Sequence, residues 1–141
     1  MAKKICVVGT GRWGKNHVKT LHNLGALQGI VEIDETKRAQ FKENYPDIQV
    51  LSSLKEAFAQ NFDGYTVATP AQTHYQIASE ILKQGKPVLV EKPLSLKLAE
   101  AKELKSIAGQ KNIPLMVGHV LLFHPAIQKI KELIQSGKIG K

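Results

Sequence analysis

Cysteine is nearly absent from this sequence. Cys6 is the single cysteine, so the chain can form no internal disulfide and no cysteine metal cluster. Because Cys6 lies in an apolar segment, we expect a small buried hydrophobic residue and not a reactive thiol. No metal site is predicted.

Arginine and aromatic residues are also scarce, although the chain is basic. The formal net charge is +8, yet Arg12 and Arg38 are the two arginines among 20 basic residues. Arginine provides the planar fork that recognises bases and phosphates, and aromatic rings stack on single-stranded bases. Aromatic residues make up only 6% of the chain. The charge therefore indicates a solvated lysine-rich surface, which would also favour a nucleotide ligand, and no nucleic-acid partner is expected.

Long apolar runs are missing as well. No run approaches the ~18 residues that a membrane span requires, so no membrane partner is expected. The N-terminal segment MAKKICVVGTG has a short apolar run before a glycine, which is typical of a first strand and not of a signal peptide. We therefore expect a cytoplasmic protein. A length of 141 residues with 43% hydrophobic residues suits one globular domain.

Strand-like and helix-like segments alternate along the chain. The expected strands span residues 4–8, 26–33, 64–68, 88–90 and 115–117. The expected helices span residues 13–24, 36–44 and 72–84, a segment from Ser52 or Ser53 to Gln60 with Glu56 placed for a capping box, a segment capped by Ser95, and one from Pro125 to Gly137. This alternation is typical of an α/β fold, here a Rossmann-type doubly wound parallel sheet. Ligands of such sheets bind outside the carboxyl ends of the strands.

The first expected strand is followed by GTGRWG, which matches the pattern G-x-G-x-x-G. We expect the whole turn to bind a dinucleotide, through Gly9, Thr10, Gly11, Arg12, Trp13 and Gly14. The first glycine allows the tight turn, the second admits the pyrophosphate, and the third lets helix and strand pack closely. Backbone N–H groups and the helix dipole would then hold the phosphates. A tight turn with no ligand is the alternative.

Asp34 lies 20 residues after Gly14, at the end of the second expected strand. An acid at this distance can accept hydrogen bonds from both hydroxyls of an adenosine ribose. It would repel a 2′-phosphate, and Glu35 adds to that repulsion, so NAD is expected and NADP less so. Arg38, one helical turn on, could soften the preference by reaching a phosphate, with help from Lys37. The alternative role for Asp34 is a helix N-cap, and the two roles can coexist.

The expected strand at residues 88–90 ends in two opposite charges and a proline, within VLVEKPLSL. Glu91 and Lys92 stand where a buried strand leaves the core, and Pro93 follows at once. In a parallel sheet this position lies at the ligand-binding edge. The alternative is a surface ion pair that contributes at most about 1 kcal/mol.

Three later segments, together with the glycine turn, resemble the nucleotide-binding half of the Gfo/Idh/MocA oxidoreductases, the family of glucose–fructose oxidoreductase and inositol dehydrogenase. VATPAQTHYQIASEIL at residues 67–82 resembles the family's strand, Thr-Pro turn and histidine-bearing helix. GKPVLVEKPLS at 85–95 resembles its most characteristic stretch, and SGKIGK at 136–141 resembles the link into its second domain. The resemblance runs from residue 4 to residue 141.

The resemblance implies a catalytic role for Lys92, beside the nicotinamide and its ribose. It implies that Glu91 orients this lysine or a ribose hydroxyl, and the family often has a cis bond before Pro93. Thr69 and Pro70 would line the path of the cofactor. His74 would lie near the nicotinamide ribose, although its spacing alone also allows a solvent-facing helical histidine.

His119, at the end of the last expected strand, is a second catalytic candidate that would face the nicotinamide. In many relatives this region carries an arginine or asparagine that helps to form the active site. Here Leu122 and Val120 stand at those positions, so substrate contacts from this loop are in doubt. His17 and His22, on the first expected helix, are interpreted as structural or solvated.

The resemblance implies reversible hydride transfer between a nicotinamide and a carbinol carbon of a sugar, nucleotide sugar or related polyol. Relatives continue into a second α+β domain, which is absent from this chain and supplies substrate contacts, a further acid/base residue and an oligomer interface. Residues 1–118 would form the Rossmann domain, and 119–141 a linking segment and helix. We expect the parent enzyme to be a homo-oligomer and this chain alone to be inactive. The alternative is a non-catalytic NAD(H)- or coenzyme A-binding module.

Overall fold

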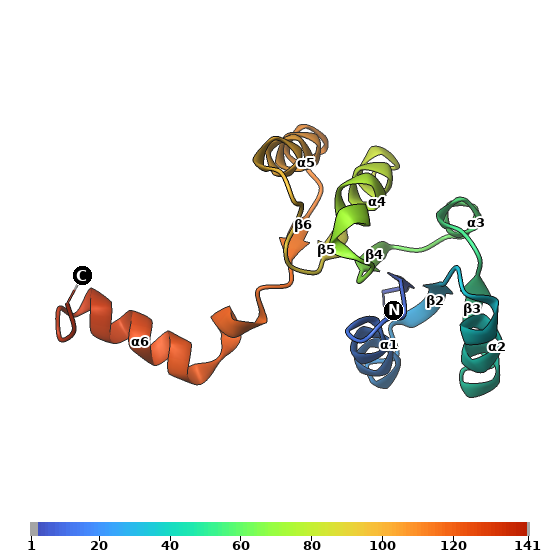
Figure 1. The fold of residues 1–141 in the computed structure, drawn as a ribbon, viewed down its shortest axis with the longest axis horizontal. Helices are drawn as coiled ribbons and strands as arrows, with labels where there is room; N and C mark the ends of the chain where they lie inside the picture. Colours follow the sequence, from blue (N-terminus) through green and yellow to red (C-terminus); the bar gives the residue numbers. More distant parts are fainter. Residues whose placement is uncertain (1–2, 141) are drawn as a thin grey trace.

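The computed structural model describes residues 3–140 and has the expected α/β architecture. Six parallel strands form one sheet in the order β3-β2-β1-β4-β5-β6 (Figure 1). The strands are β1 (Ile5–Val8), β2 (Leu27–Val31), β3 (Gln49–Leu51), β4 (Gly64–Val67), β5 (Val88–Val90) and β6 (Leu115–Val117). The helices are α1 (Gly14–Asn23), α2 (Glu35–Asn44), α3 (Leu54–Phe58), α4 (Ala71–Lys83), α5 (Leu98–Lys111), the 3₁₀ helix η1 (Val120–Phe123) and α6 (Pro125–Gln135). The Rossmann-type doubly wound sheet is thereby confirmed.

Helices cover both faces of the sheet. α1 and α2 lie on one face, and α3, α4 and α5 lie on the other (Figure 1). Each face has its own apolar core. The core under α1 and α2 consists of Val7, Val18, Leu27, Ile30 and Phe41. The larger core joins β1, β4 and β5 to α3, α4 and α5. Strands that are buried on both faces must be apolar almost throughout, which explains the short uninterrupted apolar runs in the sequence.

The order of the strands places a crevice between β1 and β4. The chain adds β2 and β3 on one side of β1, and β4, β5 and β6 on the other. The connections that leave β1 and β4 therefore run to opposite faces of the sheet and separate at its carboxyl edge. The glycine turn follows β1 and the Thr-Pro turn follows β4, so this crevice is where the predicted site residues should meet.

The strand β3 is an addition to the elements expected from the sequence. It has three residues, none of them buried, and it pairs with β2 from Gly29↔Gln49 to Val31↔Leu51. An edge strand this short has too little alternation to be distinguished from a connection. The segment expected at residues 64–68 is therefore the fourth strand in chain order and not the third.

The helix starts were predicted only in part. Ser53 caps α3 by accepting a hydrogen bond from the Glu56 N–H at 3.2 Å, while the Glu56 carboxylate accepts bonds from the N–H and the hydroxyl of Ser52. The prediction that Ser95 caps the following helix is wrong. α5 begins at Leu98, and the Ser95 hydroxyl donates to a backbone carbonyl oxygen two residues on, at 2.8 Å. That bond forms a turn before the helix and leaves the serine outside it.

The last described segment extends away from the sheet. η1 and α6 run outward from the end of β6 (Figure 1). Ile127, Ile130 and Ile134 of α6 are between 37% and 48% exposed, and α6 has no buried residue among the described positions. None of the helices within residues 3–140 is long and apolar enough to cross a membrane.

Candidate functional site

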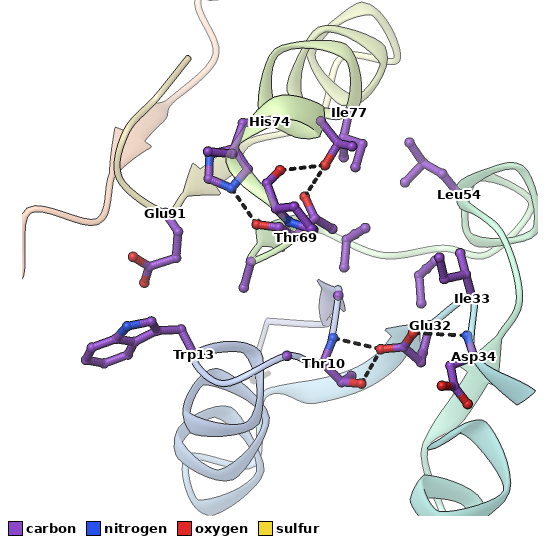
Figure 2. Close-up of a pocket in the computed structure, with 18 of the residues that line it drawn as sticks. Thr10, Trp13, Glu32, Ile33, Asp34, Leu54, Thr69, His74, Ile77 and Glu91 are labelled. Atoms are coloured by element: carbon purple, nitrogen blue, oxygen red, sulfur yellow. Dashed lines mark hydrogen bonds between the residues drawn. The ribbon is translucent and has the colours of Figure 1, made fainter. Parts of the chain in front are cut away.

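The crevice contains a cavity of about 880 Å³. The glycine turn and the end of β2 form one wall, and the loop after β4 with the start of α4 forms the other (Figure 2). Leu54, at the start of α3, lies at one end, and Glu91 lies near Trp13 at the opposite end. A cavity of this volume can hold a small-molecule ligand.

The structure brings most of the predicted site residues to this cavity. Those that line it are Gly9, Thr10, Gly11, Arg12, Trp13, Asp34, Thr69, Pro70, His74, Glu91 and Lys92. The predicted residues that do not line it are Gly14, Arg38 and His119. His119 is exposed just beyond β6, and its catalytic role stays a prediction.

The glycine turn presents backbone N–H groups to the cavity. Gly14 packs against the carbonyl group of Gly9, where a Cβ atom has no room, so it shapes the turn without lining the cavity. A Cβ at Gly11 would meet no described atom within 4 Å, so the space above it is open. Within residues 3–140, the N–H groups of Gly11, Arg12 and Trp13 have no hydrogen-bond acceptor. Unpaired donors beside an open glycine suit the oxygen atoms of a pyrophosphate.

Glu32 is the main site residue that the sequence analysis missed. It follows β2, lines the cavity and is 6% exposed. One carboxylate oxygen accepts hydrogen bonds from the Thr10 N–H, at 3.0 Å, and from the Thr10 hydroxyl. The other accepts the Asp34 N–H at 3.0 Å (Figure 2). The carboxylate thus joins the glycine turn to the acid after β2. Its charge within the otherwise apolar run GIVEI is the signal that marks it in the sequence.

Burial and hydrogen bonding act on Glu32 in opposite directions. Burial raises the pKa of this carboxyl, whereas the hydrogen bonds from Thr10 and from the Asp34 N–H, with the nearby Lys37 ammonium, lower it. The net result is a pKa below the ordinary value of 4.5. A depressed folded-state pKa means that Glu32 contributes fully to stability above the unfolded-state value. This contribution is lost as the pH falls through the folded-state pKa.

We expect Glu32→Gln to lower the free energy of unfolding by about 2 kcal/mol near neutral pH, because an amide cannot accept all of these hydrogen bonds. The deficit should shrink as the pH falls below the ordinary value of 4.5, since the native carboxyl then becomes protonated too. Urea unfolding of both proteins at a series of pH values measures the difference in the free energy of unfolding. Glu43→Gln, at an exposed position of α2, is the control. A deficit that does not change with pH would contradict this role of the charge.

Asp34 has the N-cap role that was considered as its alternative. Its Oδ1 accepts the Lys37 N–H at 3.0 Å, and the Lys37 Nζ lies 3.9 Å from Oδ2. Both residues line the cavity. Arg38 is instead held by backbone, since its Nη1 donates to the carbonyl oxygens of Glu32 and Ile33 at 3.0 and 2.7 Å. Lys37, and not Arg38, is therefore the cation at this end of the cavity.

His74 lines the cavity but is only 1% exposed, so the solvent-facing alternative is wrong. Its Nδ1 lies 2.7 Å from the carbonyl oxygen of Pro93, and its Nε2 lies 2.8 Å from that of Thr69. Carbonyl oxygens only accept hydrogen bonds, so a ring nitrogen that carries a proton donates to the carbonyl oxygen beside it. His74 thus joins the loop after β4 to the loop after β5.

Lys92 stands at the end of β5 and lines the cavity. The Lys92–Pro93 peptide bond is cis, as the resemblance implied. Glu91 is 7% exposed, and its Oε1 lies 2.7 Å from Nε2 of His17. The alternative of a surface ion pair between Glu91 and Lys92 is therefore wrong. This strand end brings an ammonium group to one end of the cavity and keeps the carboxylate for other partners.

The sequence of residues 3–119 matches the model of the Gfo/Idh/MocA family, an oxidoreductase family with an NAD-binding Rossmann fold. The chain belongs to this family. It is 29% identical over 143 residues to an inositol 2-dehydrogenase of Corynebacterium glutamicum (strain R). The alignment covers 98% of this chain and 42% of that relative.

Two solved structures are similar to this family member. GenD2 from gentamicin A biosynthesis, in complex with NAD, matches with a TM-score of 0.86 and 30% identity, over 94% of this chain and 38% of its own. The WlbA dehydrogenase of Bordetella pertussis, in complex with NADH and UDP-GlcNAcA, matches with a TM-score of 0.92 and 25% identity, over 100% of this chain and 44% of its own. The chain thus spans about 40% of the length of the relatives that it matches.

Membership of the Gfo/Idh/MocA family identifies the chain as an NAD-binding Rossmann domain of that oxidoreductase family. The residues of the cavity fit that cofactor. In the described chain, the N–H groups of Gly11, Arg12 and Trp13 lack acceptors, and the space above Gly11 is open. Asp34 and Lys92 also line the cavity. The expected cofactor and fold are therefore confirmed.

Proposed function

We propose that the whole protein is an NAD-dependent dehydrogenase that acts on a hydroxyl-bearing carbon of a sugar, a nucleotide sugar or a related polyol. The observation that carries this proposal is the spatial order of charged side chains and N–H donors along the cavity. Asp34 lies at one end, the donors of the glycine turn follow, and Glu91 and Lys92 lie at the other end. A dinucleotide would place its adenosine ribose, pyrophosphate and nicotinamide in the same order. The names of the inositol 2-dehydrogenase and of the WlbA complex with UDP-GlcNAcA support the substrate class.

The proposed reaction is hydride transfer. In the oxidising direction a carbinol carbon gives a hydride to NAD and its hydroxyl gives up a proton, which yields a carbonyl compound, NADH and a proton. The Lys92 ammonium would stabilise the negative charge that develops on the oxygen and would relay a proton. The cofactor supplies the hydride chemistry, while the chain supplies position and electric field. His119 remains a second catalytic candidate.

The preference for NAD over NADP is also part of the proposal. Asp34 uses Oδ1 for its N-cap, which leaves Oδ2 to accept a hydrogen bond from a ribose hydroxyl. The carboxylates of Asp34 and Glu32, both in the cavity wall, would repel a 2′-phosphate. Lys37, 3.9 Å from Asp34 Oδ2, would weaken that repulsion without cancelling it.

The layout of the whole protein follows from the same proposal. Residues 1–118 would form the dinucleotide-binding domain, and residues 119–141 would lead to a second domain with the remaining substrate contacts and the surface of a homo-oligomer. The exposed apolar residues of α6 agree with such a lead segment. The residues present here would then bind dinucleotide with little or no turnover. We place the protein in the cytoplasm.

The binding step can be tested with Trp13, the single tryptophan, which lines the cavity. We expect NADH to quench its emission and to receive energy from it, and to bind more tightly than NADPH. Asp34→Ser should narrow the ratio of the two dissociation constants about tenfold, because a serine removes the repelling charge. Coenzyme A is the third ligand in the titration.

Two results would contradict the proposal. If the folded chain responded to coenzyme A alone, or to none of the ligands, a binding module of another kind would be favoured. If Asp34→Ser left the ratio between NADH and NADPH unchanged, Asp34 would be an N-cap and nothing more.

A further inference from the structure

The Glu91 carboxylate has contacts with two other parts of the chain and with the residue that follows it. The Nε2 of His17, on α1, lies 2.7 Å from Oε1. The Lys92 N–H donates to Oε2 at 3.3 Å. On the third side, a Cβ atom at Gly118 would lie only 3.1–3.2 Å from the carboxylate atoms, so the backbone after β6 packs directly against them. The carboxylate is thus contacted by α1, by the backbone of Lys92 and by the end of β6.

Glu91 and His17 are largely buried, so the Glu91 carboxylate depends on these partners for its hydrogen bonds. Glu91 is 7% exposed, and the side chain of His17 is 22% exposed. A carboxylate removed from water is costly unless its oxygens are hydrogen-bonded. Oε1 has His17 as its side-chain partner within the described residues, so a change at His17 would leave this oxygen unsatisfied. The carboxylate would then turn from its present position to find water.

The contact between His17 and Glu91 links the helix after the glycine turn to the end of β5. His17 belongs to the helix that begins directly at the glycine turn, and Glu91 is the neighbour of Lys92. Figure 2 shows the Glu91 carboxylate beside Trp13, at the end of the cavity where Lys92 also lies. The pair therefore ties the turn that would hold the phosphates to the strand end that carries the ammonium group.

We propose that His17 is a positioning residue for the nicotinamide end of the site. By holding the Glu91 carboxylate, it keeps the Lys92 N–H bonded and Lys92 in its place at the cavity. His17 does not line the cavity and would not touch the cofactor itself. This inference rests on the proposed dehydrogenase function and adds to it a residue of the first helix.

The first test needs no ligand. His17→Gln keeps an N–H donor the same number of bonds from the backbone as the imidazole Nε2, whereas the amide of His17→Asn is one bond too short. Amide hydrogen exchange by NMR should be at least about tenfold faster at Lys92 in His17→Asn, and near the native rate in His17→Gln. His22→Gln, on the same helix and away from Glu91, is the matched control and should show the native rate.

The second test separates the two ends of the cofactor. NADH and ADP-ribose share everything except the nicotinamide. In His17→Asn the dissociation constant of NADH should rise about tenfold, while that of ADP-ribose should stay unchanged. His17→Gln should restore the native affinity for NADH. Should His17→Asn not fold, Glu91→Gln replaces it in both measurements, because its amide group can accept hydrogen bonds at one atom only.

Each result decides something different. A native exchange rate at Lys92 in His17→Asn would overturn the inference, whether or not NADH binds. An equal loss of affinity for NADH and ADP-ribose would also overturn it, since His17 would then support only the glycine turn. If the unaltered chain binds neither ligand, the dehydrogenase proposal fails and the positioning role fails with it. If the unaltered chain binds NADH and the His17 variants bind it equally well, the positioning role of His17 fails while the dehydrogenase proposal stands.

Discussion

Gly14→Ala should destabilise the fold by about 4 kcal/mol or more, a large share of the stability of a small domain. A Cβ at this position would lie less than 3.0 Å from both the oxygen and the carbon of the Gly9 carbonyl group, closer than real Cβ atoms come to backbone. The clash involves backbone on both sides, so no side-chain rotation can relieve it. The glycine turn would have to move away from the start of α1.

Gly11→Ala provides the matched comparison, because a Cβ there would meet no described atom within 4 Å. Its free energy of unfolding should stay within about 0.5 kcal/mol of the native value. Its affinity for NADH should fall about tenfold or more, since the methyl group would occupy the space that admits the pyrophosphate. Urea unfolding and the Trp13 titration measure the two effects. A stable Gly14→Ala, or a Gly11→Ala that binds NADH normally, would contradict the assignment of these glycines.

His74→Leu should lower the free energy of unfolding by about 3 kcal/mol, although leucine has a similar volume. The change removes the ring nitrogens that lie within hydrogen-bond distance of the carbonyl oxygens of Thr69 and Pro93, both in partly buried contacts, and leucine can donate to neither. These carbonyl groups belong to the two loops that flank the cavity, so NADH binding should weaken as well.

The exposed Gln72→Leu, on the same helix as His74, is the control for that change. It adds an apolar side chain without removing a buried hydrogen bond, and its stability should stay near the native value. If His74→Leu were as stable as the control, the two short contacts of the ring would not be hydrogen bonds of consequence.

The site residues that could be predicted from the sequence are those whose role is set within a few neighbouring residues. Gly9, Gly11 and Gly14 act through the absence of a Cβ within a single turn, so the pattern GTGRWG carries its own physical reason. The place of Lys92 was predicted in the same way, because the end of an apolar strand in a parallel sheet must lie at the ligand-binding edge, whereas its catalytic role was implied by the family resemblance. A cap can be local too, and Asp34 was correctly considered for that role.

Other residues could not be placed from the sequence because their partners are distant along the chain. Glu32 binds Thr10 across 22 residues, and His17 meets Glu91 across 74. Arg38 was expected to reach a ligand, yet it donates to backbone carbonyl oxygens of the segment before its helix. A long side chain has several partners within reach, and its choice depends on which acceptors the fold leaves unpaired.

By itself, the sequence determined the sheet of alternating strands and helices, the glycine turn and the strand end that carries Lys92. These features follow from apolar periodicity and from backbone geometry, which act over a few residues. Only the tertiary structure decided that Glu32 clamps the turn, that Lys37 and not Arg38 faces the cavity, and that His17 holds Glu91. The outcomes at Glu32 and Glu91 each pair a buried carboxylate with a partner from another part of the chain, and burial exists only once the chain has folded.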